Sequence, residues 1–432
     1  MFTKKTIHDI DISGKQVLVR ADYNVPLNKD GTIASDYRIK MSLPTIKALQ
    51  EKGCKIIICS HLGRPKSKVD PACTLRPVAK RLSQLLNQEV KFISDCAGDE
   101  TAAATADLQP GQVVLLENLR YYKEEEQNSE DFACVLAADS HAEIFVQDGF
   151  GVVHRAHAST DAITHYLPSV AGLLLEREVD TITNVMQKPE RPLMAIIGGA
   201  KIADKIDIIY KFLDLADVVV IGGAMANTFL LAQDIEVGES LVDRADLPVA
   251  VEILDKAREI AKTRRFTLYL PQDGVVAESL EKIAKTRIVD WDAHVIADIE
   301  NYPARPERSA SKVKMHEKIL DVGPFSGAFM TGAMQLCSTV VWNGTMGVTE
   351  TSAIHGPIGP FAHGTELIIE GLLGSHGHKP FSLIGGGDTT AYIEERKLTD
   401  MFNHVSTGGG ASLELMAGKT LPGVAALQEK AS

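Results

Sequence analysis

The sequence lacks several patterns that mark whole classes of protein. Its six cysteines are scattered without any C-x-x-C pair, which disfavours a disulfide framework or a zinc site and predicts reduced thiols in a cytoplasmic protein. No apolar run reaches membrane-spanning length, because the longest candidate, residues 218–232, is interrupted by two glycines and an asparagine. The opening residues, MFTKKTIHDIDISGK, contain no apolar stretch of the kind that a secretory signal needs.

Positive charge is also in short supply. The chain carries 45 lysines and arginines against 57 acidic residues, a formal charge of −12, and it has no long basic run. A general nucleic-acid binder is therefore disfavoured, and an anionic small ligand would need positive charge concentrated locally. The 432 residues, 45% of them hydrophobic, exceed what one core holds, so we expect two or three folded domains.

Short runs rich in branched residues alternate with longer amphipathic segments such as residues 75–86 and 250–261. The runs do not alternate in polarity and end in glycine or polar loops, which is typical of strands buried on both faces of a parallel sheet. The pattern predicts an α/β protein with two doubly wound, Rossmann-like lobes. The predicted strands are QVLVR, KIIICS, VKFIS, VVLLE, EIFVQD, LMAIIGG, DVVVIGG, FTLYLP, HVIAD, TVVWNG, FSLIGGG and HVSTGGG.

The boundary between the lobes is predicted near residues 173–192. There the acidic, helix-prone stretch LLLEREVDTITNVMQ runs into KPERP, just before the strand LMAIIGG. Two prolines separated by so few residues indicate a connection that ends one helix and starts a new sheet.

Polar and cationic residues follow the strands of the first half. Arginine, aspartate, asparagine and histidine occur in RADYN, HLGR, ENLR and DGFGVVHR, and Arg38 lies in the nearby segment SDYRIK. Because ligands bind at the carboxyl ends of parallel strands, we expect these side chains to meet in one cleft. The planar fork of arginine suits carboxylate and phosphate, so the pattern points to a small, highly anionic ligand.

The second half has glycine-rich turns at the strand ends instead. In IIGGAKIADK, FSLIGGGDTTA and HVSTGGGASLE a strand breaks at glycines and a helix is expected to begin, which offers free N–H groups to phosphate. Lys201 and Lys205 are predicted on one face of the first of these helices. Asp388 opens another, either as its N-cap or as a carboxylate that meets magnesium beside nucleotide phosphates.

The remaining motifs give little support for any other catalytic or metal-binding function. Gly418-Lys419-Thr420 has Leu413 where a P-loop needs its first glycine, and no G-x-G-x-x-G or G-x-S-x-G is present. The pairs His154-x-x-His157 and His376-x-His378 have no third ligand near in sequence, so exposed or helix-capping histidines are favoured over a metal site. Trp342 is interpreted as a core aromatic, with base stacking as the alternative.

Taken together, ten motifs resemble those of the phosphoglycerate kinase family, in family order and across essentially the whole chain: VRADYNVP, SDYRI, SHLGRP, ENLRYY, DGFGVVHRAHAS, GGAKIADKI, GGAMANTF, WNGTMGV, GGGDTT and HVSTGGGASLE. The resemblance implies an N-terminal 3-phosphoglycerate lobe (residues 1–172 and a returning tail, 411–432), a hinge helix and linker (173–190) and a nucleotide lobe (191–410). The implied 3-phosphoglycerate site comprises Asp22, Asn24, Arg38, His61, Arg64, Arg120 and Arg155. The implied nucleotide site comprises Gly199, Lys201, Lys205, Gly223, Asn343, Glu350, Gly386, Gly387, Asp388 and Thr389.

The chain departs from the family in the nucleotide half. Thr345 stands where proline usually follows W-N-G, and Thr349 precedes Glu350 in place of an aromatic. The loop from Thr351 to Gly364 is longer than the resemblance leads us to expect and contains GPIGP.

The resemblance implies reversible phosphoryl transfer between 1,3-bisphosphoglycerate and ADP, with Mg²⁺ carried by the nucleotide and held through Asp388. Arg38, Lys201 and the N–H groups of Gly387 and Gly410 are expected to stabilise the transferring group by position and charge, without a general base. A monomer acting on small molecules, without nucleic-acid or membrane partners, is expected. Two alternatives are an isomerase or mutase, which would need a base or phospho-acceptor at a strand end, and a non-catalytic scaffold, which should have lost the lysines and arginines.

Overall fold

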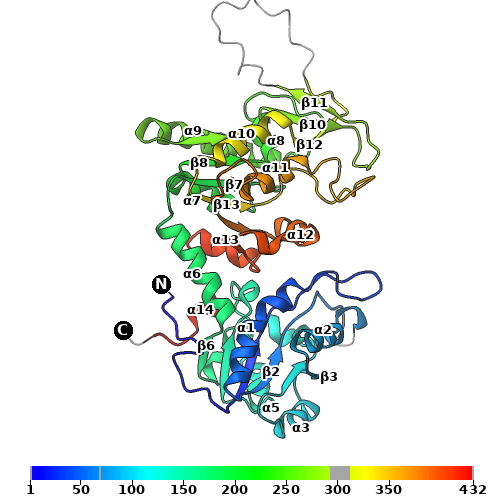
Figure 1. The fold of residues 1–432 in the computed structure, drawn as a ribbon, viewed down its shortest axis with the longest axis vertical. Helices are drawn as coiled ribbons and strands as arrows, with labels where there is room; N and C mark the ends of the chain where they lie inside the picture. The colour runs from blue at the N-terminus through cyan, green and yellow to red at the C-terminus, as the bar shows by residue number, and fades with distance from the viewer. Residues whose placement is uncertain (1, 68–69, 292–311, 431–432) are drawn as a thin grey trace, which may run out of the picture. The chain divides into compact units, whose positions relative to one another are not determined.

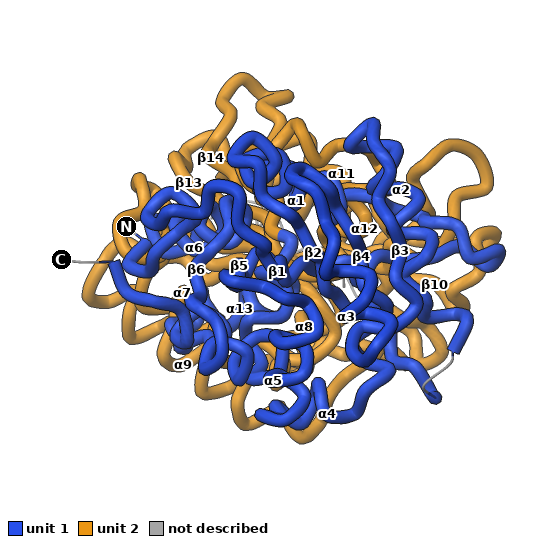
Figure 2. The backbone as a smooth tube through the Cα atoms, turned by 90° about the horizontal axis from the view of Figure 1, so that it is seen from below, with its two compact units in different colours: residues 1–184, 407–432 blue, residues 185–406 orange. Residues whose placement is uncertain are grey.

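The computed structural model describes residues 2–67, 70–291 and 312–430. The chain divides into two compact units, residues 1–184 with 407–432 (unit 1) and residues 185–406 (unit 2), coloured separately in Figure 2. None of the helices in the described ranges is both long enough and apolar enough to cross a membrane.

Unit 1 is built on a six-stranded parallel sheet with the strand order β3-β4-β2-β1-β5-β6. Its strands are β1 Gln16–Arg20, β2 Lys55–Cys59, β3 Val90–Ile93, β4 Val113–Leu116, β5 Ile144–Gln147 and β6 Ser169–Ala171. Its helices are α1 Tyr37–Glu51, α2 Arg76–Leu86, α3 Asp99–Ala106, α4 Lys123–Glu126, α5 Glu130–Asp139, α13 Gly410–Met416 and α14 Pro422–Ala425, with most of α6 Leu173–Gln187.

Successive residues of the unit 1 strands enter two different cores. Val17 and Val19 of β1 pack into one apolar cluster, whereas Leu18 packs into a second cluster on the other face of the sheet. All five residues of β1 are buried. This two-sided burial explains why the strands read as continuous apolar runs rather than alternating ones.

Unit 2 holds a second six-stranded parallel sheet, with the order β15-β14-β13-β7-β8-β9, and a small antiparallel sheet with the order β11-β10-β12. The parallel strands are β7 Leu193–Ile197, β8 Val218–Ile221, β9 Thr267–Tyr269, β13 Thr339–Asn343, β14 Phe381–Gly385 and β15 His404–Val405. The antiparallel strands are β10 Asp273–Ala277, β11 Arg287–Asp290 and β12 Lys318–Val322. The helices are α7 Ile206–Leu215, α8 Met225–Leu231, α9 Leu247–Thr263, α10 Pro324–Met334, α11 His363–Leu372 and α12 Gly387–Glu395.

The predicted fold class is confirmed: both main sheets are parallel and doubly wound, and the stretch predicted as a helix at the boundary is α6. Eleven of the twelve predicted strands form, while HVIAD lies outside the described residues. The pattern missed β6, which has only three residues, and the whole antiparallel sheet.

The two ends of the chain meet on unit 1. Lys4 pairs with Glu429 as an antiparallel bridge, and Thr6 pairs with Ala171 of β6 (Figure 1). The Lys4 ammonium also donates to the carbonyl oxygens of Ala425 (2.7 Å) and Leu427 (3.1 Å). The first residues of the chain therefore hold residues 425–429 against the unit 1 sheet.

The tail is attached to α6 at its other end. Glu178, fully buried in α6, accepts hydrogen bonds from the backbone N–H (2.7 Å) and the hydroxyl (2.8 Å) of Thr407, where the chain re-enters unit 1. Both donors of Thr407 thus meet one carboxylate oxygen.

Candidate active site

Polar side chains gather at the carboxyl edge of the unit 1 sheet, and Asp22 holds one of them, Arg38, in place. Asp22 follows β1, is 7% exposed, and its Oδ2 accepts a hydrogen bond from Arg38 Nη1 over 2.6 Å. Arg38 lies in the first turn of α1, and the same Nη1 is 3.4 Å from the Asn24 carbonyl oxygen. The strand end and the helix start therefore fix the guanidinium between them.

Two further loops join this arrangement through Gly63. Its N–H donates to Asn24 Oδ1 over 2.9 Å, and its carbonyl accepts from Arg120 Nη1 over 2.8 Å. Gly63 has a φ of +62°, a left-handed conformation that favours glycine. The loops after β1, β2 and β4 are thereby tied together, as the strand-end argument predicts.

A buried layer lies under these loops. Arg20, the last residue of β1, is 1% exposed and its Nε donates to Ser159 Oγ over 2.7 Å. Ser159 in turn donates its hydroxyl (2.6 Å) and its N–H (3.0 Å) to the fully buried Glu125. Arg20 is the arginine of the RADYN segment that was expected at the cleft, whereas Ser159 and Glu125 were not predicted to belong to the site.

The histidines of unit 1 belong to this layer. His61 is 4% exposed, with Nδ1 3.3 Å from Arg20 Nη2, and burial together with Arg20, Arg120 and Arg38 holds its pKa well below the usual range. Burial and the same kind of cationic neighbours lower the pKa of His157 to about 4. Both imidazoles are therefore neutral at neutral pH and serve as hydrogen-bonding groups, not as extra positive charges.

The interpretation of His154 and His157 as exposed or capping residues was wrong. His157 is only 6% exposed, and His154, half-buried, accepts a hydrogen bond from Arg155 Nε over 3.1 Å. No group of three or more histidine, cysteine, aspartate or glutamate side chains in the described ranges is arranged to hold a metal ion.

Seven residues were predicted for this anion site, and five of them meet: Asp22, Asn24, Arg38, His61 and Arg120. Arg64 and Arg155 are exposed, and neither guanidinium bonds to that group within the described residues. Arg155 is nevertheless near enough to contribute to the lowered pKa of Arg120. Two cations are thus left facing solvent beside a fixed polar cluster.

The lysines of unit 2 are not on a helix, which corrects the sequence prediction. After the Gly198-Gly199 turn, where Gly199 has a φ of +123°, the chain stays irregular and α7 begins at Ile206. Lys201 is exposed and has no hydrogen bond or ion pair in the described part of the chain. The two lysines therefore cannot be treated as one face of a helix.

Lys205 is the more constrained of the two. Its ammonium donates to the Gly198 carbonyl (2.6 Å), to Asn343 Oδ1 (2.6 Å) and to the Asn343 carbonyl (3.1 Å), so all three of its N–H donors have an acceptor. Burial lowers its pKa to about 8, against the opposing attraction of Asp388 and Asp204. Through these three hydrogen bonds, the Lys205 ammonium links the end of β7 to the end of β13.

Asn343 is left with an unused donor. The side chain is 1% exposed, its Oδ1 faces Lys205, and its buried Nδ2 has no hydrogen-bond partner. Gly386, with a φ of +92°, passes so close that a Cβ there would lie 3.0–3.2 Å from this amide. Thr389 Oγ1 accepts the Gly344 N–H over 2.7 Å and so fixes the residue after β13.

Asp388 is not the N-cap of its helix, so that alternative is wrong. Helix α12 begins at Gly387, the N-cap is Gly386, and no side chain caps it. Asp388 and Gly387 are both exposed on the first turn. Gly410 begins α13, which belongs to unit 1, and a Cβ there would be 3.4 Å from His154 Nε2.

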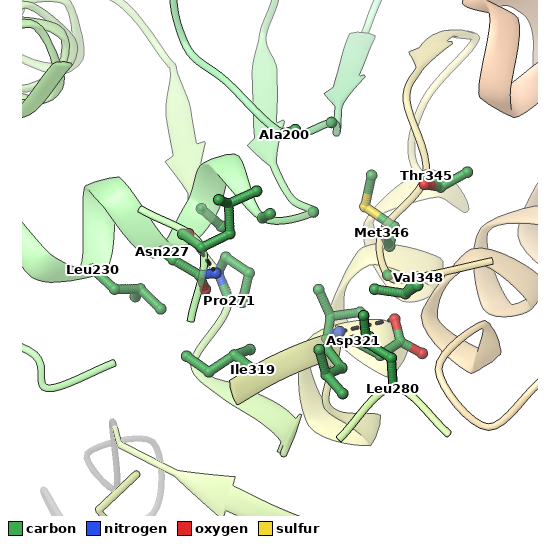
Figure 3. A pocket seen from close by; sticks show the side chains of 18 of the residues that line it. Ala200, Asn227, Leu230, Pro271, Leu280, Ile319, Asp321, Thr345, Met346 and Val348 are labelled. Carbon is green, nitrogen blue, oxygen red and sulfur yellow. Dashed lines mark hydrogen bonds between the residues drawn. The ribbon is translucent and has the colours of Figure 1, made fainter. Parts of the chain in front are cut away.

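A cavity of about 420 Å³ opens in unit 2 beside these turns (Figure 3). Of the predicted nucleotide residues, Gly199, Gly223, Glu350 and Asp388 line it, and so does Thr345. Most of the remaining wall is apolar and includes Leu230, Leu241, Pro271, Leu280, Trp291, Ile319, Met346 and Val348. The predicted residues Lys201, Lys205, Asn343, Gly386, Gly387 and Thr389 do not line it.

Two buried carboxylates in the cavity wall were not predicted. Asp273 caps α10 by accepting the N–H groups of Phe325 (3.0 Å) and Ser326 (2.8 Å). Asp321 caps α11 by accepting the N–H of Gly364 over 2.9 Å, and burial raises its pKa to about 8. Both follow from the antiparallel sheet that the sequence pattern missed, and both serve to position helices.

Comparison with known proteins gives one consistent result. Residues 7–419 match the sequence profile of the family described as Phosphoglycerate kinase. The chain is 43% identical over 427 residues to the phosphoglycerate kinase of Moorella thermoacetica, covering 99% of this chain and 100% of the relative. It is 46% identical over 431 residues to that of a Nostoc species, covering 99% and 100%.

Solved structures agree. A phosphoglycerate kinase from Coxiella burnetii matches with a TM-score of 0.79 and 35% identity, covering 98% of each chain. One from Pyrococcus horikoshii matches with a TM-score of 0.79 and 29% identity, covering 99% of this chain and 98% of the other. The resemblance drawn from the ten motifs is confirmed.

Proposed function

Because the chain belongs to the phosphoglycerate kinase family and carries its activity, we propose that unit 1 binds the phosphoglycerate and unit 2 the nucleotide. The reaction is the reversible transfer of the acyl phosphate of 1,3-bisphosphoglycerate to ADP, giving ATP and 3-phosphoglycerate. The observation that carries the assignment of unit 1 is the Asp22–Arg38 pair, which fixes a guanidinium at the carboxyl edge of the parallel sheet.

The phosphoglycerate site consists of fixed and free cations. Arg38 and Arg120 are held by Asp22 and Gly63, and each keeps further N–H donors for an anion. Arg64 and Arg155 are exposed and can close on a phosphate or carboxylate bidentately. Neutral His61 and Asn24 add hydrogen bonds, and Asp22 serves to orient Arg38.

The nucleotide site combines the cavity with the glycine turns. Its apolar wall suits a base, and Gly199 and Gly223 leave room for the chain of phosphates. We assign Glu350, which also lines the cavity, to the ribose. The free Nδ2 of Asn343, held by Lys205, supplies a buried donor at the end of β13. The predicted set of Gly199, Lys201, Lys205, Gly223, Asn343, Glu350, Gly386, Gly387, Asp388 and Thr389 remains our proposal for this site.

Magnesium belongs to this site as part of the substrate Mg·ADP or Mg·ATP. Asp388 is a single exposed carboxylate on the first turn of α12. One carboxylate together with phosphate oxygens and waters is how magnesium is usually held in kinase sites. The donor set therefore fits a metal that arrives with the nucleotide.

Phosphoryl transfer requires no proton movement in this reaction. An anionic oxygen of the ADP β-phosphate forms the new bond to phosphorus, while the bond from phosphorus to the acyl oxygen breaks and its electrons remain on the carboxylate of 3-phosphoglycerate. Arg38, Lys201 and the N–H groups of Gly387 and Gly410 would stabilise the charge in transit. The low pKa values of His61 and His157 support a mechanism without acid–base catalysis.

Turnover requires the two substrates to meet away from water. The two sets of residues belong to different units, which α6 connects. Closure about this hinge would bring the sets together and protect the acyl phosphate from hydrolysis. We assign residues 1–172 with 411–432 to the phosphoglycerate lobe, 173–190 to the hinge and 191–410 to the nucleotide lobe.

We also propose a cytoplasmic monomer that acts on small molecules only. All six cysteines are free thiols, which supports a reducing compartment, and the net charge of −12 disfavours nucleic acid as a partner. The decisive experiment is coupled turnover of 3-phosphoglycerate with Mg·ATP. Product formation that depends on both substrates is expected, and its absence at micromolar enzyme would refute the proposed function.

A further inference from the structure

One amide side chain lies in the wall of the unit 2 cavity among apolar residues. Asn227 belongs to α8, is 1% exposed, and lines the cavity together with Leu230, which is one turn further along the same helix face. Figure 3 draws Asn227, Leu230 and Pro271 on one side of the cavity and Thr345, Met346 and Val348 on the other. Buried polar atoms are normally hydrogen-bonded, so each atom of the Asn227 amide should have a partner in the protein or in a ligand.

The orientation of the Asn227 amide is fixed by its surroundings. Its Nδ2 donates to the carbonyl oxygen of Leu241 over 3.2 Å. A flipped amide would lose this bond and set two acceptor oxygens against each other. The Oδ1 therefore stays on the side away from the Leu241 carbonyl, and it accepts no hydrogen bond from the described residues.

The other polar side chains near Asn227 in the cavity wall are already hydrogen-bonded within the protein. Asp273 and Asp321 also line it, but their oxygens accept the backbone N–H groups that begin α10 and α11. Leu230, Pro271 and Ile319 supply apolar surface for a planar ring. An unpartnered acceptor among apolar side chains discriminates strongly between a donor and an acceptor on the ligand. If the ligand presents an acceptor, both groups lose their hydrogen bonds to water and gain none in return.

We propose that Asn227 is a specificity-determining residue that reads the 6-position of the purine. Its Oδ1 accepts a hydrogen bond from the 6-amino group of adenine and opposes the 6-oxo group of hypoxanthine or guanine. The inference rests on the proposed nucleotide site, and it adds the residue that selects an adenine nucleotide. Leu241 acts through Asn227 by holding its amide in one orientation.

The first test uses the unmodified protein and three diphosphates that differ at one position. Equilibrium binding should be tightest for ADP, about 5-fold weaker for purine riboside diphosphate, which lacks the amino group, and about 10-fold weaker for IDP. Equal dissociation constants for ADP and IDP would overturn the proposal without any variant.

The second test compares two substitutions on the same helix face. Asn227→Leu removes the acceptor and should bring the IDP to ADP ratio of dissociation constants from about 10 to about 2 or less. Leu230→Ala, the matched control, removes apolar contact only and should weaken both ligands while leaving the ratio unchanged. A ratio that stays at about 10 in Asn227→Leu, or that collapses equally in Leu230→Ala, would contradict the role of Asn227.

These outcomes are separable from those that test the function itself. The KM for 3-phosphoglycerate should be the same in Asn227→Leu as in the unmodified protein, because Asn227 belongs to unit 2. If the protein phosphorylates 3-phosphoglycerate but uses ADP and IDP equally, the proposed function holds and the proposed role of Asn227 is refuted. Failure of all turnover would remove the function and still leave the binding ratios to be measured.

Discussion

Asp22 Oδ2 lies 2.6 Å from Arg38 Nη1, so the carboxylate that follows β1 holds the guanidinium that opens α1. Asp22 is 7% exposed, and the Arg38 side chain is 27% exposed. Within the described residues the Arg38 side chain donates only through Nη1, so its other N–H groups are available to a ligand. The pair combines a fixed position with free donors, which is what transition-state stabilisation requires.

Arg38→Ala should therefore lower kcat by about 10²-fold or more, because a prepositioned charge is lost from the transferring group. Steady-state kinetics with saturating substrates measures this directly. Arg81→Ala is the matched control, since Arg81 forms a comparable 2.6 Å ion pair with Asp36. Near-normal turnover in Arg38→Ala would remove Arg38 from the catalytic role.

Arg64→Ala should act mainly on binding. Arg64 is exposed, and we assign it to the distant phosphate and carboxylate rather than to the transferring group. The KM for 3-phosphoglycerate should rise about 10-fold or more, as expected for the loss of a charge-assisted hydrogen bond, with a smaller change in kcat. Arg258→Ala, which removes an exposed arginine of α9, should leave this KM as it is. An unchanged KM in Arg64→Ala would count against the placement.

Lys205 should make stability depend on pH in the alkaline range. Its pKa is about 8 in the folded protein and near 10.5 when exposed, so between these values the unfolded chain binds more protons. Stability therefore rises with pH from about 8 to 10.5, by at most about 1.4 kcal/mol per pH unit. The difference in unfolding free energy between the unmodified protein and Lys205→Met should grow across this window.

Denaturant unfolding at several pH values between 7.5 and 10 measures that difference. Lys201→Met is the control, because it removes an exposed lysine from the same loop and should show the pH dependence of the unmodified protein. A Lys205→Met variant whose stability tracks the unmodified protein at every pH would show that the ammonium is not buried as described.

Asp388→Asn should weaken the use of the magnesium nucleotide. The change removes one negative charge from the first turn of α12 without altering its shape, so the KM for Mg·ATP should rise about 10-fold. The KM for 3-phosphoglycerate should not change, and Asp400→Asn, an exposed carboxylate in unit 2, should change neither. Equal nucleotide KM values in both variants would contradict the assignment.

Thr407→Val should loosen the returning tail. Removing the hydroxyl leaves the buried Glu178 carboxylate without one of its donors, at a cost of about 1–3 kcal/mol. Hydrogen exchange in α13 should accelerate, whereas Thr263→Val, which removes an exposed helix-end hydroxyl, should leave it unchanged. Unaltered exchange in α13 would mean that the Glu178 contact does not anchor the tail.

Much of the fold was predictable because parallel strands buried on both faces have a distinctive composition. The antiparallel sheet was not, because its strands do not form long apolar runs: Lys318 and Ile319 of β12 are only half-buried and Ile288 of β11 is 57% exposed. The misplaced helix at Lys201 has a different cause. A glycine turn predicts that a strand ends but does not fix where the next helix begins, and here seven residues intervene between Gly198 and α7 at Ile206.

The site was predictable to the extent that function follows strand ends. Asp22, Arg38 and Arg120 come together because their loops share one edge of the sheet. Burial of Glu125 and His157 could not be inferred, since each lies in a short irregular or helical segment whose packing depends on residues far away in sequence. Pairwise contacts of this kind leave no periodic signal.

The division of unit 1 into two stretches of sequence also constrains when it can mature. Residues 407–430 are synthesised after the whole of unit 2, and they supply the Thr407 contact with α6 and the Lys4–Glu429 pairing. Unit 2 is continuous and can complete its own structure on the ribosome first. Unit 1, which contains the first residue of the chain, therefore reaches its final form only after unit 2 has been synthesised.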